Sequence, residues 1–163
     1  MTKKLLTVFT LFFTLSLLTA QDTQFPDMTI PDLDGNKVDV KALSMEGKPV
    51  VLAFWATWCG PCMLELNAIN EHIDDWVEET GVKFYGVSVD DSKTVSRVRP
   101  LVNGKGWNFD ILLDTNNELK RHLNFSTPPY VVVIKDGNVV YKHLGYQPGA
   151  EHELYEKIKE YSN

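Results

Sequence analysis

The feature that most constrains the fold is the stretch from Val50 to Cys62, where an apolar run leads directly into a Cys-x-x-Cys pair. Residues 50–55 are uninterrupted apolar side chains that follow Gly47 and Pro49, which predicts a short strand buried on both faces. Beyond the second cysteine the apolar residues recur at the spacing of one helix face: Leu66, Ile69, Ile73 and Trp76. The cysteines therefore lie where a buried strand passes into the N-terminus of a helix.

Cys59 and Cys62 are the two cysteines of the chain, and Pro61 between them suits the first turn of a helix. Unpaired backbone N–H groups and the helix dipole stabilise a thiolate at such a position. A structural disulfide is the alternative, but a bridge across two residues removes little chain entropy compared with one that closes a long loop. The pair is therefore predicted to be redox-active.

Residues 55–62, with the sequence Trp-Ala-Thr-Trp-Cys-Gly-Pro-Cys, resemble the active-site motif of thioredoxins. Among these they are most similar to the extracytoplasmic TlpA/ResA-like thiol–disulfide oxidoreductases, and the resemblance covers nearly all of residues 25–161. It implies an α/β, thioredoxin-like fold with a central mixed β-sheet flanked by helices. An N-terminal β-hairpin and a helix–strand–helix insertion are expected in addition.

The predicted elements follow the order of that fold. The N-terminal hairpin joins residues 28–30 to 37–40 through a stretch rich in turn formers. The other expected elements are a helical turn at 42–46, strand 50–55, helix 59–80, strand 82–89, a helix from 90–92 to about 102 that Pro100 kinks or shortens, strand 111–113, helix 117–123, strands 130–134 and 138–144 around an Asp136-Gly137 turn, and helix 151–161.

The two cysteines are expected to have different roles. Cys59 is the N-terminal and more exposed one, so it is predicted to attack as the thiolate and to form the mixed disulfide with substrate. Cys62 lies one turn into the helix on its inward stripe and is predicted to be the buried resolving thiol. Trp58 is interpreted as part of a substrate-docking surface, with an exposed aromatic tolerated at a loop as the alternative.

A buried acid near the resolving thiol assists exchange in thioredoxin-like proteins by accepting the proton of that thiol. The position used by thioredoxin, six residues before the first cysteine, is Ala53 here. TlpA/ResA-like proteins often have a glutamate three residues after the second cysteine, so the resemblance implies that Glu65 is catalytic. A solvated helix glutamate is the alternative. Asn67 stands where that group often has proline.

Thr127-Pro128-Pro129 precedes the most β-prone run of the chain. Thioredoxin-like proteins hold a cis-proline opposite the cysteines, which exposes the backbone of the preceding residue to an extended substrate. Counting back from Gly137 as in TlpA/ResA-like sequences selects Pro128, whereas counting as in thioredoxin selects Pro129. We expect the cis-proline at Pro128, with Thr127 as the residue that contacts substrate.

Other uses of the cysteine pair do not fit its surroundings, and no cofactor or metal is expected. A c-type haem site needs histidine where Met63 stands, and a peroxiredoxin centre resembles a pattern with proline where Leu52 stands. A zinc site needs two more ligands, and the histidines show no pairing at ligand spacing: His72, His122, His143 and His152.

The N-terminus reads as a secretory signal peptide, with Lys3 and Lys4 before an uncharged stretch that ends near Ala20. We therefore expect residues 1–20 to be removed and residues 21–163 to form a thioredoxin-like domain in the periplasm or outside the cell. An uncleaved membrane anchor is the alternative.

Charge and motif together indicate the partners. Loss of the two lysines changes the formal net charge from −6 to −8, which argues against nucleic acid. Gly60-Pro61 resembles the dipeptide of reducing thioredoxins, so the expected function is reduction of disulfide-containing protein substrates by a monomer that a membrane-borne thiol donor recharges. A disulfide oxidase or isomerase, or a redox-inert binding module on the same scaffold, are the alternatives.

Overall fold

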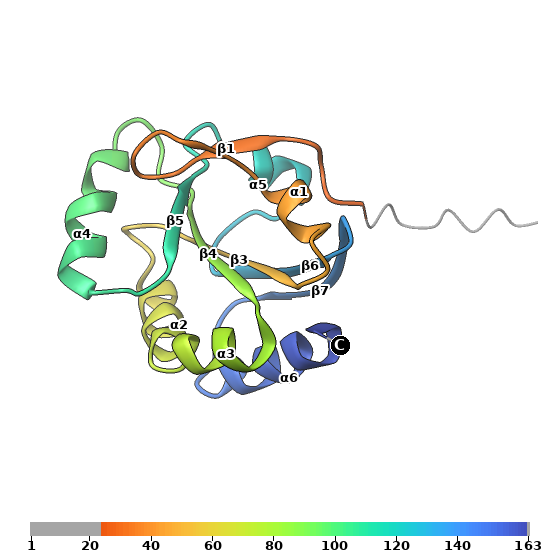
Figure 1. The fold of residues 1–163 in the computed structure, drawn as a ribbon. Helices are drawn as coiled ribbons and strands as arrows, with labels where there is room; N and C mark the ends of the chain where they lie inside the picture. Colours follow the sequence, from red (N-terminus) through yellow and green to blue (C-terminus); the bar gives the residue numbers. More distant parts are fainter. Residues whose placement is uncertain (1–23, 163) are drawn as a thin grey trace, which may run out of the picture.

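Strand β3 (Val50–Trp55) is the centre of the structure, and all of its residues are buried. A computed structural model describes residues 24–162 (Figure 1). In it β3 pairs in parallel with β4 (Lys83–Ser88) and antiparallel with β6 (Tyr130–Lys135). The continuous apolar run matches this position, because a strand with a neighbour on each side and helices over both faces has no polar side.

Two further strands complete a mixed sheet in the order β5-β4-β3-β6-β7. Strand β5 (Asp110–Leu113) runs parallel to β4, and β7 (Asn138–Leu144) runs antiparallel to β6. A separate hairpin is formed by β1 (Thr29–Pro31) and β2 (Lys37–Asp39). The predicted thioredoxin-like α/β architecture, with its N-terminal hairpin and its insertion between β4 and β6, is confirmed.

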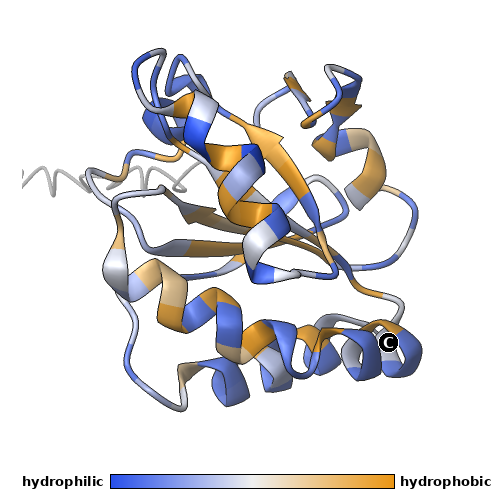
Figure 2. Ribbon diagram, turned by 90° about the vertical axis from the view of Figure 1, so that its left-hand side faces the viewer, coloured by the Kyte–Doolittle hydropathy of each residue, from blue (hydrophilic) through white to orange (hydrophobic). Residues whose placement is uncertain are grey.

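Helices lie on both faces of this sheet (Figure 1). Helices α2 (Gly60–Asn70), α3 (Ile73–Thr80) and α6 (Ala150–Ser162) pack together on one face. The short helices α1 (Val40–Ser44) and α5 (Glu118–His122) lie on the other, and α4 (Val98–Lys105) flanks the β5 side. Apolar residues colour the strands and the helix faces turned toward them in Figure 2, so the core lies between the sheet and its helices.

The helix predicted over residues 59–80 is two helices, α2 and α3, which are separated at Glu71 and His72. A straight helix of that length would extend about 33 Å, whereas a six-residue strand spans about 20 Å, so the helix must change direction to remain against the sheet. Side chains near the break bind the segment before β5. Asn67 Oδ1 accepts the indole N–H of Trp107 at 3.0 Å, and Asn70 Oδ1 accepts the Asn108 N–H at 2.7 Å.

The helix predicted to start at residues 90–92 begins and ends later than expected. A 3-10 turn over Val95–Arg97 precedes α4, which continues to Lys105 and ends at Gly106. Pro100 lies in the first turn of α4, where backbone N–H groups have no partner within the helix, so it does not shorten the helix.

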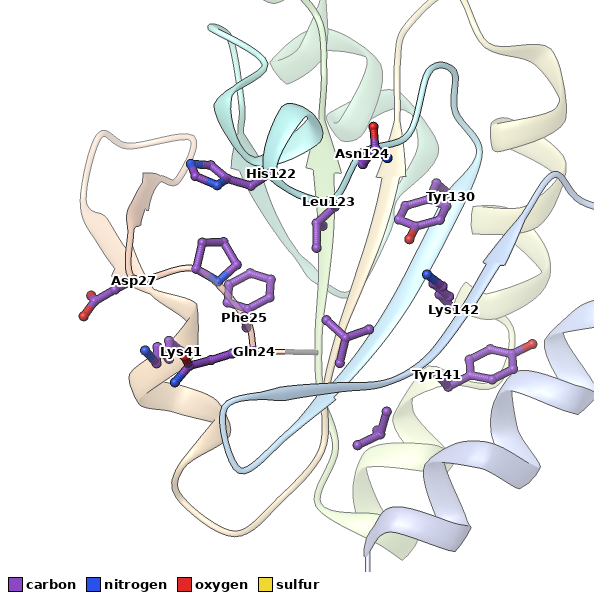
Figure 3. A pocket seen from close by; sticks show the side chains of 13 residues that line it. Gln24, Phe25, Asp27, Lys41, His122, Leu123, Asn124, Tyr130, Tyr141 and Lys142 are labelled. Carbon is purple, nitrogen blue, oxygen red and sulfur yellow. The ribbon is translucent and has the colours of Figure 1, made fainter. Parts of the chain in front are cut away.

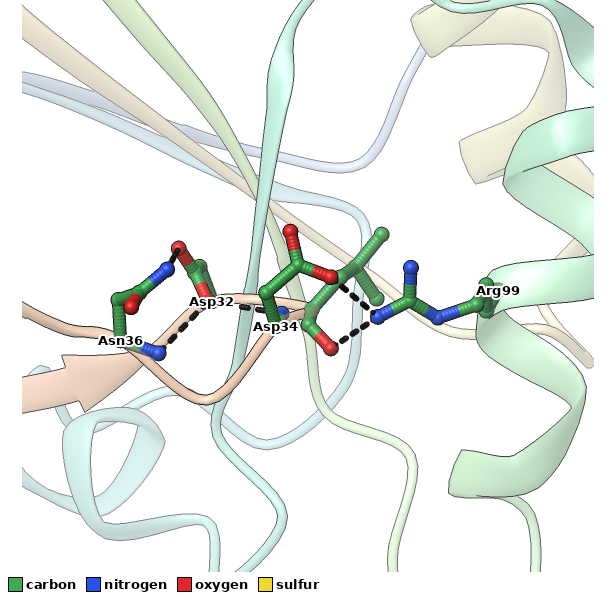
Figure 4. Close-up of polar contacts among 5 residues, drawn as sticks. Asp32, Asp34, Asn36 and Arg99 are labelled. Atoms are coloured by element: carbon green, nitrogen blue, oxygen red, sulfur yellow. Dashed lines mark hydrogen bonds and ion pairs between the residues drawn. The ribbon is translucent and has the colours of Figure 1, made fainter.

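The turn of the N-terminal hairpin is organised by the carboxylate of Asp32 (Figure 4). It accepts the N–H groups of Asp34 and Asn36 at 2.8 and 2.9 Å and the side-chain amide of Asn36 at 2.9 Å. Arg99 of α4 donates to the Leu33 carbonyl and pairs with Asp34 at 2.8 Å. The hairpin is thereby tied to the insertion.

The predicted signal peptide, residues 1–20, lies outside the described residues. Within residues 24–162, none of the helices has the length and apolar character needed to cross a membrane.

Candidate active site

The predicted site residues meet at one edge of the sheet. Phe54, near the end of β3, lies opposite Tyr130, the first residue of β6, and Tyr130 lies opposite Leu144, the last residue of β7. Because β4 runs parallel to β3, its C-terminal end is at this edge as well. The loop before α2, the segment after β4, the prolines before β6 and the end of β7 are therefore neighbours.

Cys59 and Cys62 form a disulfide at the start of α2, with their Cα atoms 5.3 Å apart. Cys59 is the N-cap of the helix, and its sulfur accepts the Cys62 N–H at 3.3 Å. Cys59 is 6% exposed and Cys62 is fully buried. The less deeply buried cysteine thus lies where helix-terminal N–H groups favour a thiolate, and the fully buried one lies within the helix, as the sequence predicts.

The loop that carries Cys59 is fixed from inside the protein by Asp90, which is fully buried. Its carboxylate accepts the Thr57 N–H at 2.8 Å and the Thr57 hydroxyl at 2.6 Å. The Ser88 hydroxyl donates to the same carboxylate at 2.9 Å. Sequence reasoning treated Asp90 only as a helix cap. Its position directly after a buried parallel strand could have indicated that it lies beside the loop.

Trp58 and the segment before β6 flank the cysteines. Trp58 is 58% exposed, which leaves its indole available for contact. Thr127 is exposed and Pro128 is half-buried. These three residues lie on the two loops that the pairing of β3 with β6 brings to one edge.

The expected cis-proline at Pro128 is wrong, because the cis peptide bond joins Pro128 to Pro129 and so belongs to Pro129. Pro129 is buried, and its carbonyl accepts the Gly145 N–H at 2.8 Å. Pro129 directly precedes Tyr130, the first residue of β6, so the count that suits thioredoxin is the one that holds in this chain.

Glu65 is 2% exposed, which excludes a solvated helix glutamate. Glu65 lies on the buried face of α2, one turn after Cys62, which lies on the same face. Its Oε1 lies 2.8 Å from Nε2 of His143 on β7. Sequence reasoning missed His143, because the pairing joins residues from two distant elements. Its alternation with Tyr141 along β7 is a signal that both face the same side.

Further acids surround this pair. Tyr141 donates to Glu153 at 3.2 Å, and Tyr146 donates to Glu151 at 3.0 Å. Burial, followed by the charge of Glu153, raises the pKa of Tyr141 to about 12. Burial, followed by the bond to Glu151, raises the pKa of Tyr146 to about 12. The charge of Glu65 contributes to both increases, so Glu65 lies within electrostatic reach of a cluster poor in cations.

A pocket of about 980 Å³ lies apart from the cysteines, although Tyr141 belongs to its lining (Figure 3). Phe25, Tyr130 and Val139 contribute apolar lining, while Lys41 and His122 come from α1 and α5. Neither cysteine and none of the other predicted site residues lines it. Within residues 24–162, no group of three or more potential metal ligands occurs.

Comparison with known proteins agrees with this geometry. The Redoxin family pattern matches residues 20–158. The thiol-disulfide oxidoreductase ResA of Bacillus anthracis is 33% identical over 133 residues, which cover 81% of this chain and 74% of that protein. ResA of Bacillus subtilis is 29% identical over 122 residues, covering 74% of this chain and 65% of that protein.

Solved structures give the same result for the fold. An uncharacterized thioredoxin-like protein from Porphyromonas gingivalis is 40% identical, with a TM-score of 0.73 over 86% of this chain and 92% of that one. StoA from Bacillus subtilis is 21% identical, with a TM-score of 0.68 over 82% of this chain and 97% of that one. With a Cys-x-x-Cys disulfide at the start of α2, the chain belongs to the redoxin family, as a TlpA/ResA-like thiol–disulfide oxidoreductase of the thioredoxin superfamily.

Proposed function

We propose that this oxidoreductase acts as a reductant of protein disulfides outside the cytoplasm. In the reduced protein the Cys59 thiolate attacks a substrate disulfide and forms a mixed disulfide, releasing the first substrate thiol. The Cys62 thiol then loses its proton to the Glu65 carboxylate and attacks the sulfur of Cys59. The Cys59–Cys62 bond forms, the bond to substrate breaks, and the substrate leaves as the second thiol.

The observation that carries the reducing direction is the charge around the disulfide. Helix α2 contains no basic residue, and the titratable side chain on its buried face beside Cys62 is the acid Glu65. A strong oxidant stabilises its reduced form through an unusually low nucleophile pKa, which takes extra donors or positive charge at the thiolate. A nearby carboxylate acts against that stabilisation, and Gly60-Pro61 resembles the dipeptide of low-potential thioredoxins.

Substrate docking is assigned to the two loops beside Cys59. Trp58 offers apolar contact area, and an extended substrate segment would lie along Thr127 and Pro128, before the cis bond to Pro129. The substrates are disulfide-containing proteins rather than nucleic acids. A membrane-borne thiol donor returns the two electrons after each cycle, and the protein acts as a monomer.

The reduction potential of the Cys59–Cys62 pair tests this function. Purified protein is equilibrated with glutathione buffers, and the free thiols are quantified by alkylation. We expect a potential near that of thioredoxin, about −270 mV. A potential above about −180 mV, the value for protein disulfide isomerase, would indicate that the protein is an oxidase or isomerase and not a reductase. If the cysteine pair does not exchange with glutathione at all, the remaining function is that of a redox-inert binding module.

Export is the second part of the proposal. Residues 1–20 are assigned as a cleaved signal peptide and residues 21–163 as the mature thioredoxin-like domain, on the basis of the basic head and uncharged stretch of the sequence. N-terminal sequencing of protein recovered from the periplasm or medium is expected to start close to Gln21. Retention of Lys3 in the membrane fraction would indicate an anchor instead.

A further inference from the structure

We propose that His143 is a positioning residue for the exchange reaction, and that its Nε2–H bond holds Glu65 as the ionised carboxylate that accepts the Cys62 proton. This inference rests on the proposed catalytic role of Glu65 and extends it to a residue on a different element. Three observations carry it: the burial of Glu65, its contact with His143, and the shortage of other cations around it.

Burial makes the partner of Glu65 important. A carboxylate that is 2% exposed loses most of its hydration, and an ionised acid in such a place needs a hydrogen-bonded partner. His143 supplies that partner at 2.8 Å. An ionised carboxylate can only accept, so the proposal places the proton of this bond on Nε2.

Apart from His152 of α6, which lies 3.9 Å from Glu151, the groups that the structure places around the pair are phenols, acids and the sulfur of Cys62. They are Tyr141 on β7, Tyr146 in the loop after it, Glu151 and Glu153 on α6, Glu71 after α2, and Cys62 on α2 itself. Nearby negative charge disfavours a carboxylate in general, and the hydrogen bond that Glu65 receives comes from His143.

The second ring nitrogen indicates how His143 acts. Nδ1 is buried and has no hydrogen-bond partner among residues 24–162. An imidazolium would leave a buried N–H donor unpaired there, which costs more than an unpaired acceptor on a neutral ring. The geometry therefore favours the Nε2–H donor, rather than a positive charge, as the feature through which His143 acts.

The reaction step that depends on this bond is resolution of the mixed disulfide. The Cys62 proton moves to Glu65, and the electron pair left on the Cys62 sulfur forms the bond to Cys59. The substrate sulfur leaves with the electron pair of the broken bond and is protonated by water, and Glu65 then returns its proton to water. Without His143, Glu65 would lose the hydrogen bond that favours its ionised form, the form that can accept that proton.

The test measures resolution by the reduced protein with insulin as disulfide substrate, between about pH 5.5 and 9. His143→Leu removes the donor, whereas His143→Gln keeps an amide N–H at a similar reach. At neutral pH we expect His143→Leu to be slower by about tenfold or more, with recovery to near the wild-type rate at alkaline pH. His143→Gln is expected to stay within about threefold at every pH, because a neutral donor suffices.

Two controls separate this role from a structural one. His122→Leu alters an exposed histidine on α5, on the other face of the sheet, and is expected to leave the profile unchanged. The double variant Glu65→Gln/His143→Leu is expected to match Glu65→Gln alone, because His143 acts through Glu65. If His143→Leu does not fold, His143→Asn, an amide too short to reach Oε1, takes its place.

The outcomes distinguish this inference from the function on which it rests. A Glu65→Gln variant with the wild-type rate at every pH would remove Glu65 from the reaction, and the inference with it. A slow Glu65→Gln together with an unchanged His143→Leu profile would overturn the inference alone. The inference would also be overturned if His143→Leu slowed resolution equally at all pH values, or if His143→Gln were as slow as His143→Leu. A double variant whose rate loss equals the product of the losses in Glu65→Gln and His143→Leu would overturn it as well.

Discussion

Two turns of this molecule are held by the same device, an aspartate carboxylate that accepts three hydrogen bonds, yet they lie in different environments. Asp90 is fully buried and holds the loop that carries Cys59. Asp32 is only half-buried and holds the turn of the N-terminal hairpin through hydrogen bonds that are exposed to solvent. Water can replace the acceptor at Asp32 but not at Asp90, so similar contact patterns contribute differently to stability. The buried carboxylate, which holds its turn more rigidly, is the one beside the cysteines.

Replacement of Asp90 is expected to have the largest effect. Asp90→Ala leaves the Thr57 N–H and two hydroxyl groups without their acceptor in a buried site, although it also removes a buried charge. We expect the free energy of unfolding of the oxidised protein to fall by about 3 kcal/mol. Urea denaturation measures it, with Asp91→Ala on the neighbouring exposed residue as the control. Equal losses at Asp90 and Asp91 would show that burial of the carboxylate does not decide how much it contributes to stability.

Thr57→Val sharpens the comparison by removing one hydrogen bond at constant shape. Oδ1 of Asp90 loses the hydroxyl bond of 2.6 Å while the backbone bond to Oδ2 remains. The expected loss is about 1.5 kcal/mol in the same assay. Thr94→Val is the matched control, since its hydroxyl lies 3.4 Å from the exposed Asp91. A loss at Thr57 no greater than that at Thr94 would contradict the assignment.

The turn of the N-terminal hairpin is also held by an ion pair, and removing this pair should lower the free energy of unfolding less. Arg99→Gln removes the ion pair with Asp34, whose two side chains are 52% and 73% exposed. We expect a loss of about 0.5 kcal/mol at low salt, which should disappear near about 1 M salt, where the screening length is about 3 Å. Arg97→Gln serves as the control. A loss above that of Thr57→Val would mean that the hairpin turn, not the active-site loop, is the more strongly held.

The smallest effect is expected at Asp32 and depends on pH. The side-chain amide of Asn36, followed by backbone N–H groups, lowers the pKa of Asp32. Its stabilising contribution is therefore present above the unfolded pKa, about 3.9, and is lost as the pH falls through the lower folded value. Asp32→Asn should be slightly less stable than wild type at neutral pH, and the difference should vanish in acid. A Tm difference that grows on acidification would reverse the assigned sign.

Elements whose signal is local could be predicted from the sequence. The buried run at 50–55, the Asp136-Gly137 turn and the three-residue spacing from Cys62 to Glu65 each depend on neighbours along the chain, and the structure places them as expected. The break after Asn70 could not be read in this way, because helix periodicity continues across it. Only the extent of the sheet beneath it requires the helix to turn.

The parts that were missed depend on contacts between distant segments. The bond from Thr57 to Asp90 spans 33 residues and that from Glu65 to His143 spans 78. A single sequence carries no direct signal of either pairing. The predicted cis-proline was one residue too early, because two adjacent prolines precede β6 and their sequence alone does not show which peptide bond is cis.

The place of β7 in the sheet has a consequence for motion. It is an outermost strand that pairs along its length with β6 alone, apart from a bridge between Gln24 and Asn138, and the β6–β7 ladder contains a register shift at Val133 and Ile134. Outer strands open at a lower free energy than central ones, so amide hydrogen exchange should be faster in β7 than in β3. Each such opening carries His143 away from Glu65. On the proposed role of His143, the fraction of molecules able to resolve a mixed disulfide is then set in part by the local unfolding equilibrium of one strand.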